Sequence, residues 1–168
     1  MRRLAVIGAL LLLATTAPTA QAAHPSWVRA DLDGRPTPTD RIADHYCHDR
    51  DFPVIHCYST PIALQESLAA ASAADLAVAP KQSTSDYVVV YSGLAYSGSY
   101  MFISQNYDAL AIVGWNDRIR SYRVLNGRAG TFYTDWFGSG AVLQFCCGAA
   151  VTSLSSTFDA QISSVYQR

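Results

Sequence analysis

The chain has 168 residues and a formal net charge of −1 at pH 7. This length is enough for one domain with a hydrophobic core. A nearly neutral balance does not favour nucleic acid as a partner, because binding to phosphates needs an excess of Lys and Arg.

Residues 1–22 have the three parts of a secretory signal peptide. Arg2 and Arg3 form a basic start, residues 4–17 are apolar, and Ala20–Ala22 has the small-x-small pattern of a cleavage site. The apolar run is shorter than the roughly 20 residues that a membrane span needs. We therefore expect a secreted protein, cut after Ala22, with no membrane segment once the signal is removed. Loss of the two arginines leaves ten basic and thirteen acidic residues, a net charge near −3.

Residues 23–85 form an N-terminal extension that precedes a β-rich region. Residues 23–45 contain three prolines and Gly34 among charged residues, which predicts a linker or an irregular segment. Val54–Tyr58 is predicted to be a short strand. Thr60 followed by proline suits the start of a helix, and the alanine-rich stretch after it favours one short helix.

From residue 86 to residue 168, short runs of β-branched and aromatic residues alternate with Gly, Ser, Asn and Asp. The runs begin with DYVVVYSG and end with ISSVYQ. Many short strands separated by turn residues are typical of an all-β sandwich or barrel. We therefore predict an all-β domain over residues 86–168.

The β-rich region contains an internal repeat. Two tyrosines are each followed seven residues later by glycine, Tyr91 by Gly98 and Tyr133 by Gly140. In addition, WNDRIRS at 115–121 aligns with FDAQISS at 158–164. A half of about four strands cannot bury its apolar face alone, so we expect two similar halves packed against each other.

The repeat makes paired predictions about its members. Each tyrosine should pack over a folded hairpin, and each glycine should supply a backbone conformation that is costly for other residues. Ser121 and Ser164 should tie a turn to backbone groups. Trp115 and Phe158 should occupy equivalent buried positions.

These motifs resemble the signatures of the β/γ-crystallin family. In that family each Greek-key motif carries an aromatic residue followed seven positions later by Gly, matched here by YSGLAYSG and YTDWFGSG. Each motif also carries a loop with two Asn or Asp, two variable residues, a Ser or Thr, and a final Ser. NDRIRS and DAQISS match this loop with one departure each. The resemblance implies a double Greek-key, β/γ-crystallin-like sandwich over residues 86–168 and does not cover residues 23–85.

Calcium is the usual ligand of the resembled family, in sites shared between the two loops. The fifth-position hydroxyl of one loop meets the second-position acid of the other. The resemblance therefore implies at most one weak calcium site here, formed by Asp117, Ser163 and the backbone carbonyl of Gln161. The alternative that both loops are only turns stays open.

The same crossing places both departures from the pattern in the other site. Arg120 replaces the fifth-position hydroxyl of the first loop, and Ala160 replaces the second-position acid of the second loop. We expect this second site to be disabled, with Arg120 beside Asp159 as a built-in cation. A solvated arginine on a turn is the alternative.

Export makes disulfide bonds the expected state of the four cysteines, Cys47, Cys57, Cys146 and Cys147. Neighbouring residues of a strand point to opposite faces, so a bond between the last two would strain the backbone. We therefore expect at least one bond from Cys47 or Cys57 to Cys146 or Cys147, the alternative being a local Cys47–Cys57 loop. Zinc binding by the His and Cys residues of 45–57 has no standard spacing to support it.

The sequence carries no nucleophile or phosphate-binding motif, so we do not expect an enzyme. The chain resembles secreted bacterial crystallin-fold metalloproteinase inhibitors, which favours inhibition of an extracellular protease. Asp135, Trp136 and Phe137 are then the candidate binding residues, provided that their aromatic rings are not core. The alternatives are a calcium-stabilised extracellular structural protein and a toxin-like antimicrobial protein.

Overall fold

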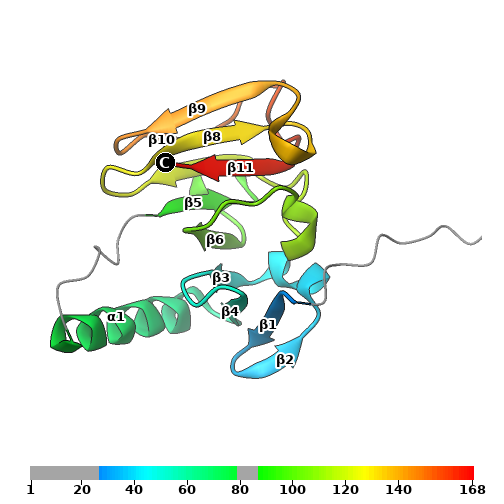
Figure 1. The fold of residues 1–168 in the computed structure, drawn as a ribbon. Coiled ribbons are helices and arrows are strands. Elements are labelled where there is room, and N and C mark those ends of the chain that lie inside the picture. The colour runs from blue at the N-terminus through cyan, green and yellow to red at the C-terminus, as the bar shows by residue number, and fades with distance from the viewer. Residues whose placement is uncertain (1–26, 79–86) are drawn as a thin grey trace, which may run out of the picture.

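The structure, a computed structural model, describes residues 27–78 and 87–168, without the side chains of residues 73–78. The predicted signal peptide over residues 1–22 lies outside the described residues. The described chain forms an eight-stranded sheet, a three-stranded sheet and one α-helix (Figure 1). Within residues 27–78 and 87–168, no helix combines the length and the apolar character that crossing a membrane requires.

The N-terminal extension contains four strands, of which only one was predicted. They are β1 (Arg29–Leu32), β2 (Arg35–Thr37), β3 (Tyr46–His48) and β4 (Val54–Tyr58), with the 3-10 helix η1 (Thr39–Asp44) between β2 and β3. The prediction for β4 is confirmed. The expectation of an irregular segment over residues 23–45 is wrong for β1 and β2, because β1 pairs in parallel with the later strand β4. Pro36 is tolerated because β2 is an edge strand.

Helix α1 (Pro61–Val78) begins at the predicted residue. The backbone N–H of Ala63 donates to Thr60 Oγ1 at 3.2 Å, which caps the first turn. Leu64 is buried in a small apolar cluster with Tyr87, Val89 and Phe102. The helix therefore covers the outer face of the larger sheet.

The remaining strands confirm the predicted double Greek key. They are β5 (Val88–Tyr91), β6 (Tyr100–Ile103), β7 (Ser121–Val124), β8 (Ala129–Tyr133), β9 (Val142–Cys146), β10 (Ala150–Val151) and β11 (Ser164–Gln167). β10 comes from the second half of the repeat but pairs with β7 of the first half. Reciprocally, Tyr107 of the first half bridges Val165 of β11. Each half thus lends a segment to the other's sheet.

The extension continues the sheet of the first half without a break. β3 pairs in parallel with β6, so the strand order is β10-β7-β5-β6-β3-β4-β1-β2. Asp49, just after β3, accepts hydrogen bonds from Ser104 N and Oγ at 2.7 Å each, from Gln105 N at 3.2 Å and from Tyr107 Oη at 3.0 Å. Burial raises the pKa of this fully buried carboxyl. Four donors on one carboxylate tie the extension to the first half.

The core lies between the two sheets and shows where the halves differ. Ile119 and Ile162, which the repeat aligns, are both completely buried. Trp115 is also completely buried, whereas Phe158 is only half-buried, so the prediction of equivalent burial fails for Phe158. In the first half η1 packs against the residue before Trp115: a Cβ on Gly114 would lie 3.1 Å from the carbonyl oxygens of Thr39 and Asp40. The three-stranded sheet of the second half pairs with no described strand of the extension.

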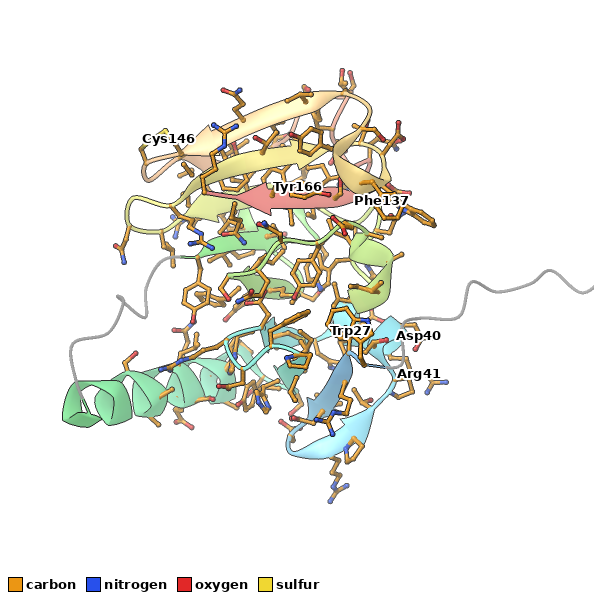
Figure 2. The ribbon with its side chains drawn as sticks, viewed as in Figure 1. Trp27, Asp40, Arg41, Phe137, Cys146 and Tyr166 are labelled. Atoms are coloured by element: carbon orange, nitrogen blue, oxygen red, sulfur yellow. A yellow bond between two sulfur atoms is a disulfide. The ribbon has the colours of Figure 1, made fainter. Side chains whose placement is uncertain are left out.

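The disulfides correct the predicted pairing. Cys47 bonds Cys57, and Cys146 bonds Cys147, so no bond joins the two pairs. Cys47 and Cys57 are antiparallel partners on β3 and β4, 4.1 Å apart at Cα, whereas Cys146 lies on the three-stranded sheet (Figure 2). The argument from strand alternation fails because β9 ends at Cys146 and Cys147 already has a turn conformation, with φ of 60°.

Candidate functional site

The calcium ligands and the binding residues predicted from the sequence line one open depression. Its lining includes all six of them, Asp117, Gln161, Ser163, Asp135, Trp136 and Phe137, together with Asn116, Thr134 and Ser139. The loop between η3 (Leu110–Val113) and β7 provides Asp117, and the turn η4 (Trp136–Gly138) provides the two aromatic rings. Two sets of residues that the sequence analysis treated separately thus line one depression.

The turn η4 presents its two aromatic side chains to solvent. Phe137 is 72% exposed and has φ of 55°, in the left-handed region that a bulky residue rarely adopts. Trp136 is 45% exposed. The backbone is held firmly: Phe137 N donates to Asp108 O at 2.8 Å, and Ser164 Oγ donates to Asp135 O at 2.7 Å. The predicted role of Ser164 is therefore confirmed.

The first half contains the same turn with different side chains. In η2 (Leu94–Tyr96), Ala95 has φ of 51°, and Ser121 Oγ donates to Gly93 O at 2.6 Å. Leu94 and Ala95 stand where the second half has Trp136 and Phe137. The left-handed backbone therefore belongs to the fold, while the exposed aromatic pair belongs to the second turn alone.

The two loops cross with near-perfect symmetry. Asp117 N donates to Ile162 O at 3.0 Å, and the aligned Ala160 N donates to Ile119 O, also at 3.0 Å. Asp117 and Ala160 both have positive φ, 55° and 53°. The second positions of the two loops are therefore equivalent in space, as the repeat predicts.

A chain of hydrogen bonds joins the acid of the first loop to the exposed indole. Ser163 Oγ donates to Asp117 Oδ1 at 3.1 Å, and Asn116 Nδ2 donates to Asp117 Oδ2 at 2.7 Å. Trp136 Nε1 in turn donates to Asn116 Oδ1 at 2.9 Å. Sequence reasoning did not assign Asn116 a role, although its place as the first residue of the loop motif could have indicated one. The meeting of Asp117 and Ser163 is the crossing that the resemblance implies.

The equivalent position on the other side is occupied by an ion pair. Arg120 Nε and Nη2 donate to the two oxygens of Asp159, at 3.0 and 2.9 Å. These bonds lower the pKa of Asp159 and raise the pKa of Arg120. The prediction of Arg120 beside Asp159 is confirmed. Since Ala160 offers no side-chain oxygen, this side presents a guanidinium where a cation would otherwise lie.

The histidines of the extension do not assemble into a zinc site. Cys47 and Cys57 are bonded to each other, so neither is a thiolate ligand. His56 instead lies between Asp31, at 2.7 Å from Nδ1, and Asp51, at 3.4 Å from Nε2. Burial, with the nearby His56, lowers the pKa of His48 to about 4. Within residues 27–78 and 87–168, no three His, Cys, Asp or Glu side chains are grouped to hold a metal ion.

Comparison with known proteins finds likeness in structure only. No family model and no curated protein matches the chain. A β/γ-crystallin from Ciona intestinalis is 19% identical over 48% of this chain and 98% of its own, with a TM-score of 0.44. A β/γ-crystallin domain from Flavobacterium johnsoniae is 25% identical over 49% of this chain and 94% of its own, also with a TM-score of 0.44. An archaeal β/γ-crystallin is 24% identical over 49% and 98%, with a TM-score of 0.44. These likenesses concern the fold alone.

Proposed function

We propose that the chain is a secreted crystallin-fold inhibitor of an extracellular protease, with metalloproteinases the favoured class. In this proposal Trp136 and Phe137 enter an apolar pocket of the enzyme. The observation that carries it is the ring of Phe137, 72% exposed on a left-handed backbone. The buried Cys47–Cys57 bond suits an oxidising compartment, which supports the extracellular part of the proposal.

An exposed aromatic residue with a left-handed backbone lowers the stability of the free chain, which favours a role for its ring in binding a partner. A left-handed conformation costs a residue other than glycine on the order of 1 kcal/mol, and glycine would remove that cost. Aromatic residues dominate binding energy at protein interfaces because they bury a large area with little loss of side-chain freedom. Phe137 therefore has the character of an interface anchor.

The rigidity of the turn favours a role as an inhibitor of the protease over cleavage of the turn as a substrate. Backbone bonds from Phe137 to Asp108 and around Asp135, together with Ser164, brace the turn from both sides. A segment held in this way cannot become extended for peptide hydrolysis without losing these bonds. Binding also costs little ordering entropy when the presented turn is already fixed.

Calcium binding at the same depression is a second proposal, favoured by the contact between Asp117 and Ser163. Their side chains and the backbone carbonyl of Gln161 offer only oxygen, which is the donor type that Ca²⁺ prefers. The crossing of the two loops provides a single carboxylate, that of Asp117, so the calcium site is expected to be weak. A bound ion would join the two loops and add its binding free energy to the stability of the fold.

The test is a panel of secreted metallo-, serine and cysteine proteases, incubated with the purified chain from residue 23 onward. We expect inhibition of a metalloproteinase, weakened about 30-fold by Phe137→Ala, since an anchor contributes roughly 2 kcal/mol. Leu94→Ala, at the matched position of the first turn, should leave inhibition unchanged. No inhibition across the panel would contradict the proposal.

Two further measurements test the alternative functions. Inhibition of bacterial growth by the purified chain would support a toxin-like antimicrobial protein. A melting temperature that rises with calcium would support a calcium-stabilised structural protein.

A further inference from the structure

The two disulfides are of opposite kinds. Cys47–Cys57 is completely buried and joins paired strands across a separation of ten residues. Cys146–Cys147 joins neighbours in sequence, and both residues are exposed. Exposed disulfides are the ones that external thiols reach, whereas buried ones are protected. The contrast within one chain predicts different chemistry for the two bonds.

The exposed bond contributes little to holding the fold. A disulfide stabilises mainly by closing a loop of the unfolded chain, and a bond between neighbours encloses no intervening residue. The turn has backbone bonds of its own, since Cys147 N donates to Arg128 O at 3.0 Å and Ala149 N donates to Cys146 O at 2.9 Å. The turn from β9 to β10 therefore has support that does not depend on the sulfur–sulfur bond.

The surroundings of the exposed bond leave room for a reacting partner. A hollow lined in part by Cys146, Gln144 and Arg168 opens beside it. Cys146 and Phe137 lie at opposite ends of the three-stranded sheet (Figure 2), so this place is separate from the proposed inhibitory turn. A small thiol can approach one sulfur without disturbing the other site.

We propose that Cys146–Cys147 is a thiol–disulfide exchange site for external low-molecular-weight thiols. A thiolate attacks one Sγ, a mixed disulfide forms, and the electron pair of the broken bond leaves on the other Sγ, which takes a proton from solvent. A second thiolate then attacks the mixed disulfide, and the two external thiols depart as their own disulfide. The chain gains two electrons and two protons and carries two free thiols. An external disulfide reverses both steps.

The experiment is reduction of the folded chain with glutathione, followed by trapping with iodoacetamide and peptide mapping. We expect Cys146 and Cys147 to be alkylated at least about tenfold faster than the Cys47–Cys57 pair, which should react only after denaturation. Equal rates, or slower reaction of the exposed pair, would overturn the proposal. So would free thiols at Cys146 and Cys147 in protein purified without reductant.

A variant without the exposed bond checks the same proposal independently of the wild-type rates. The double variant Cys146→Ser, Cys147→Ser should take up no label in the folded state and should keep the melting temperature of the wild type. It should also keep any protease inhibition, because the proposed inhibitory turn is elsewhere. A large loss of stability would show that the bond is a structural staple and would contradict its assignment as an exchange site.

Discussion

The two halves of the repeat have the same backbone and different side chains. In both, a left-handed residue sits in a turn that a serine ties to the backbone, and the loops cross through matched hydrogen bonds of 3.0 Å. The first turn carries Leu94 and Ala95, and the second carries Trp136 and Phe137. The comparison teaches that the fold maintains the geometry of both turns, while their exposed surfaces differ through the side chains placed on them.

The halves also differ in what covers them. The extension adds β3 to the edge of β6 and places η1 beside Trp115, so the first half is covered (Figure 1). Among the described strands, the edge of β9 has no partner other than β8. The second half therefore has an unpaired edge among the described strands, and it carries both the exposed aromatic turn and the exposed disulfide.

The largest expected effect tests whether the extension is an integral part of the first half. Asp49→Ala would leave the buried hydroxyl of Tyr107 without its acceptor and would remove the acceptor of the half-buried Ser104 and Gln105 donors. We expect the free energy of unfolding to fall by about 3 kcal/mol or more, measured by denaturant titration. Asp44→Ala is the matched control in the extension, because its ion pair with Arg118 is exposed and should contribute less than about 1 kcal/mol. If the free energy of unfolding falls by a similarly small amount in both variants, Asp49 does not tie the extension to the first half.

The second effect tests the chemical difference between the two loops. We expect calcium to bind at one site at most, and Asp117→Ala to abolish the binding. Arg120→Ser alone should add no site, whereas Arg120→Ser with Ala160→Asp should add one. Calcium at a hundred times its dissociation constant would stabilise the binding protein by about 2.7 kcal/mol, seen as a raised melting temperature. Two equivalent strong sites in the wild type, found by calorimetric titration, would contradict the scheme.

The third effect concerns how much the left-handed conformation of Phe137 lowers the stability of the fold. Phe137→Gly should raise the free energy of unfolding by about 1 kcal/mol, because glycine adopts the left-handed conformation without steric cost. Phe137→Ala keeps a Cβ and should show no such gain. Denaturant unfolding of both variants measures the difference. A loss of stability in the glycine variant would indicate that the ring packs within the chain and is not held for a partner.

The smallest effect is the pH dependence of the ion pair between Arg120 of the first loop and Asp159 of the second. Arg120 lowers the pKa of Asp159 from its usual 3.8, so the pair stabilises the fold above that value and loses its effect as pH falls through the lowered pKa. The melting temperature of Arg120→Ser should therefore lie below that of the wild type at pH 7 and converge with it in acid. In an Asp159→Asn background the same substitution should show no such pH dependence. If the difference in melting temperature between wild type and Arg120→Ser stays constant across the acid range, the ion pair is not its cause.

The parts of the fold that the sequence predicted are those encoded by short repeated motifs. The serine ties follow from aligning two loops, whereas the crossing at Asp117 and Ala160 and the position of Arg120 beside Asp159 follow from the family resemblance that the aligned loops carry. Local signals also located the start of α1 at the cap formed by Thr60. These features depend on neighbours in sequence or on the symmetry of the repeat, and both are visible in a single chain.

The features that the sequence missed depend on contacts between distant segments. β1 is a strand because β4 pairs with it. Cys47 bonds Cys57, which the sequence offered only as the alternative pairing, because β3 and β4 bring the two residues face to face. Neither pairing has a local signal. The helix η1, which packs against Gly114 next to Trp115, likewise lies outside the repeat. The exposure of Phe137 could not be distinguished from a core position by sequence, since an aromatic residue suits both.

The most direct test of the account is to convert the second turn into a copy of the first. The double variant Trp136→Leu, Phe137→Ala gives the second turn the side chains of Leu94 and Ala95, which the same backbone already accommodates. The measurement is its inhibition constant against the most sensitive protease of the panel, with the melting temperature as a check on folding. The account predicts an intact fold and inhibition weakened at least about 100-fold, since two anchors are removed. Unchanged inhibition by the folded variant would contradict it.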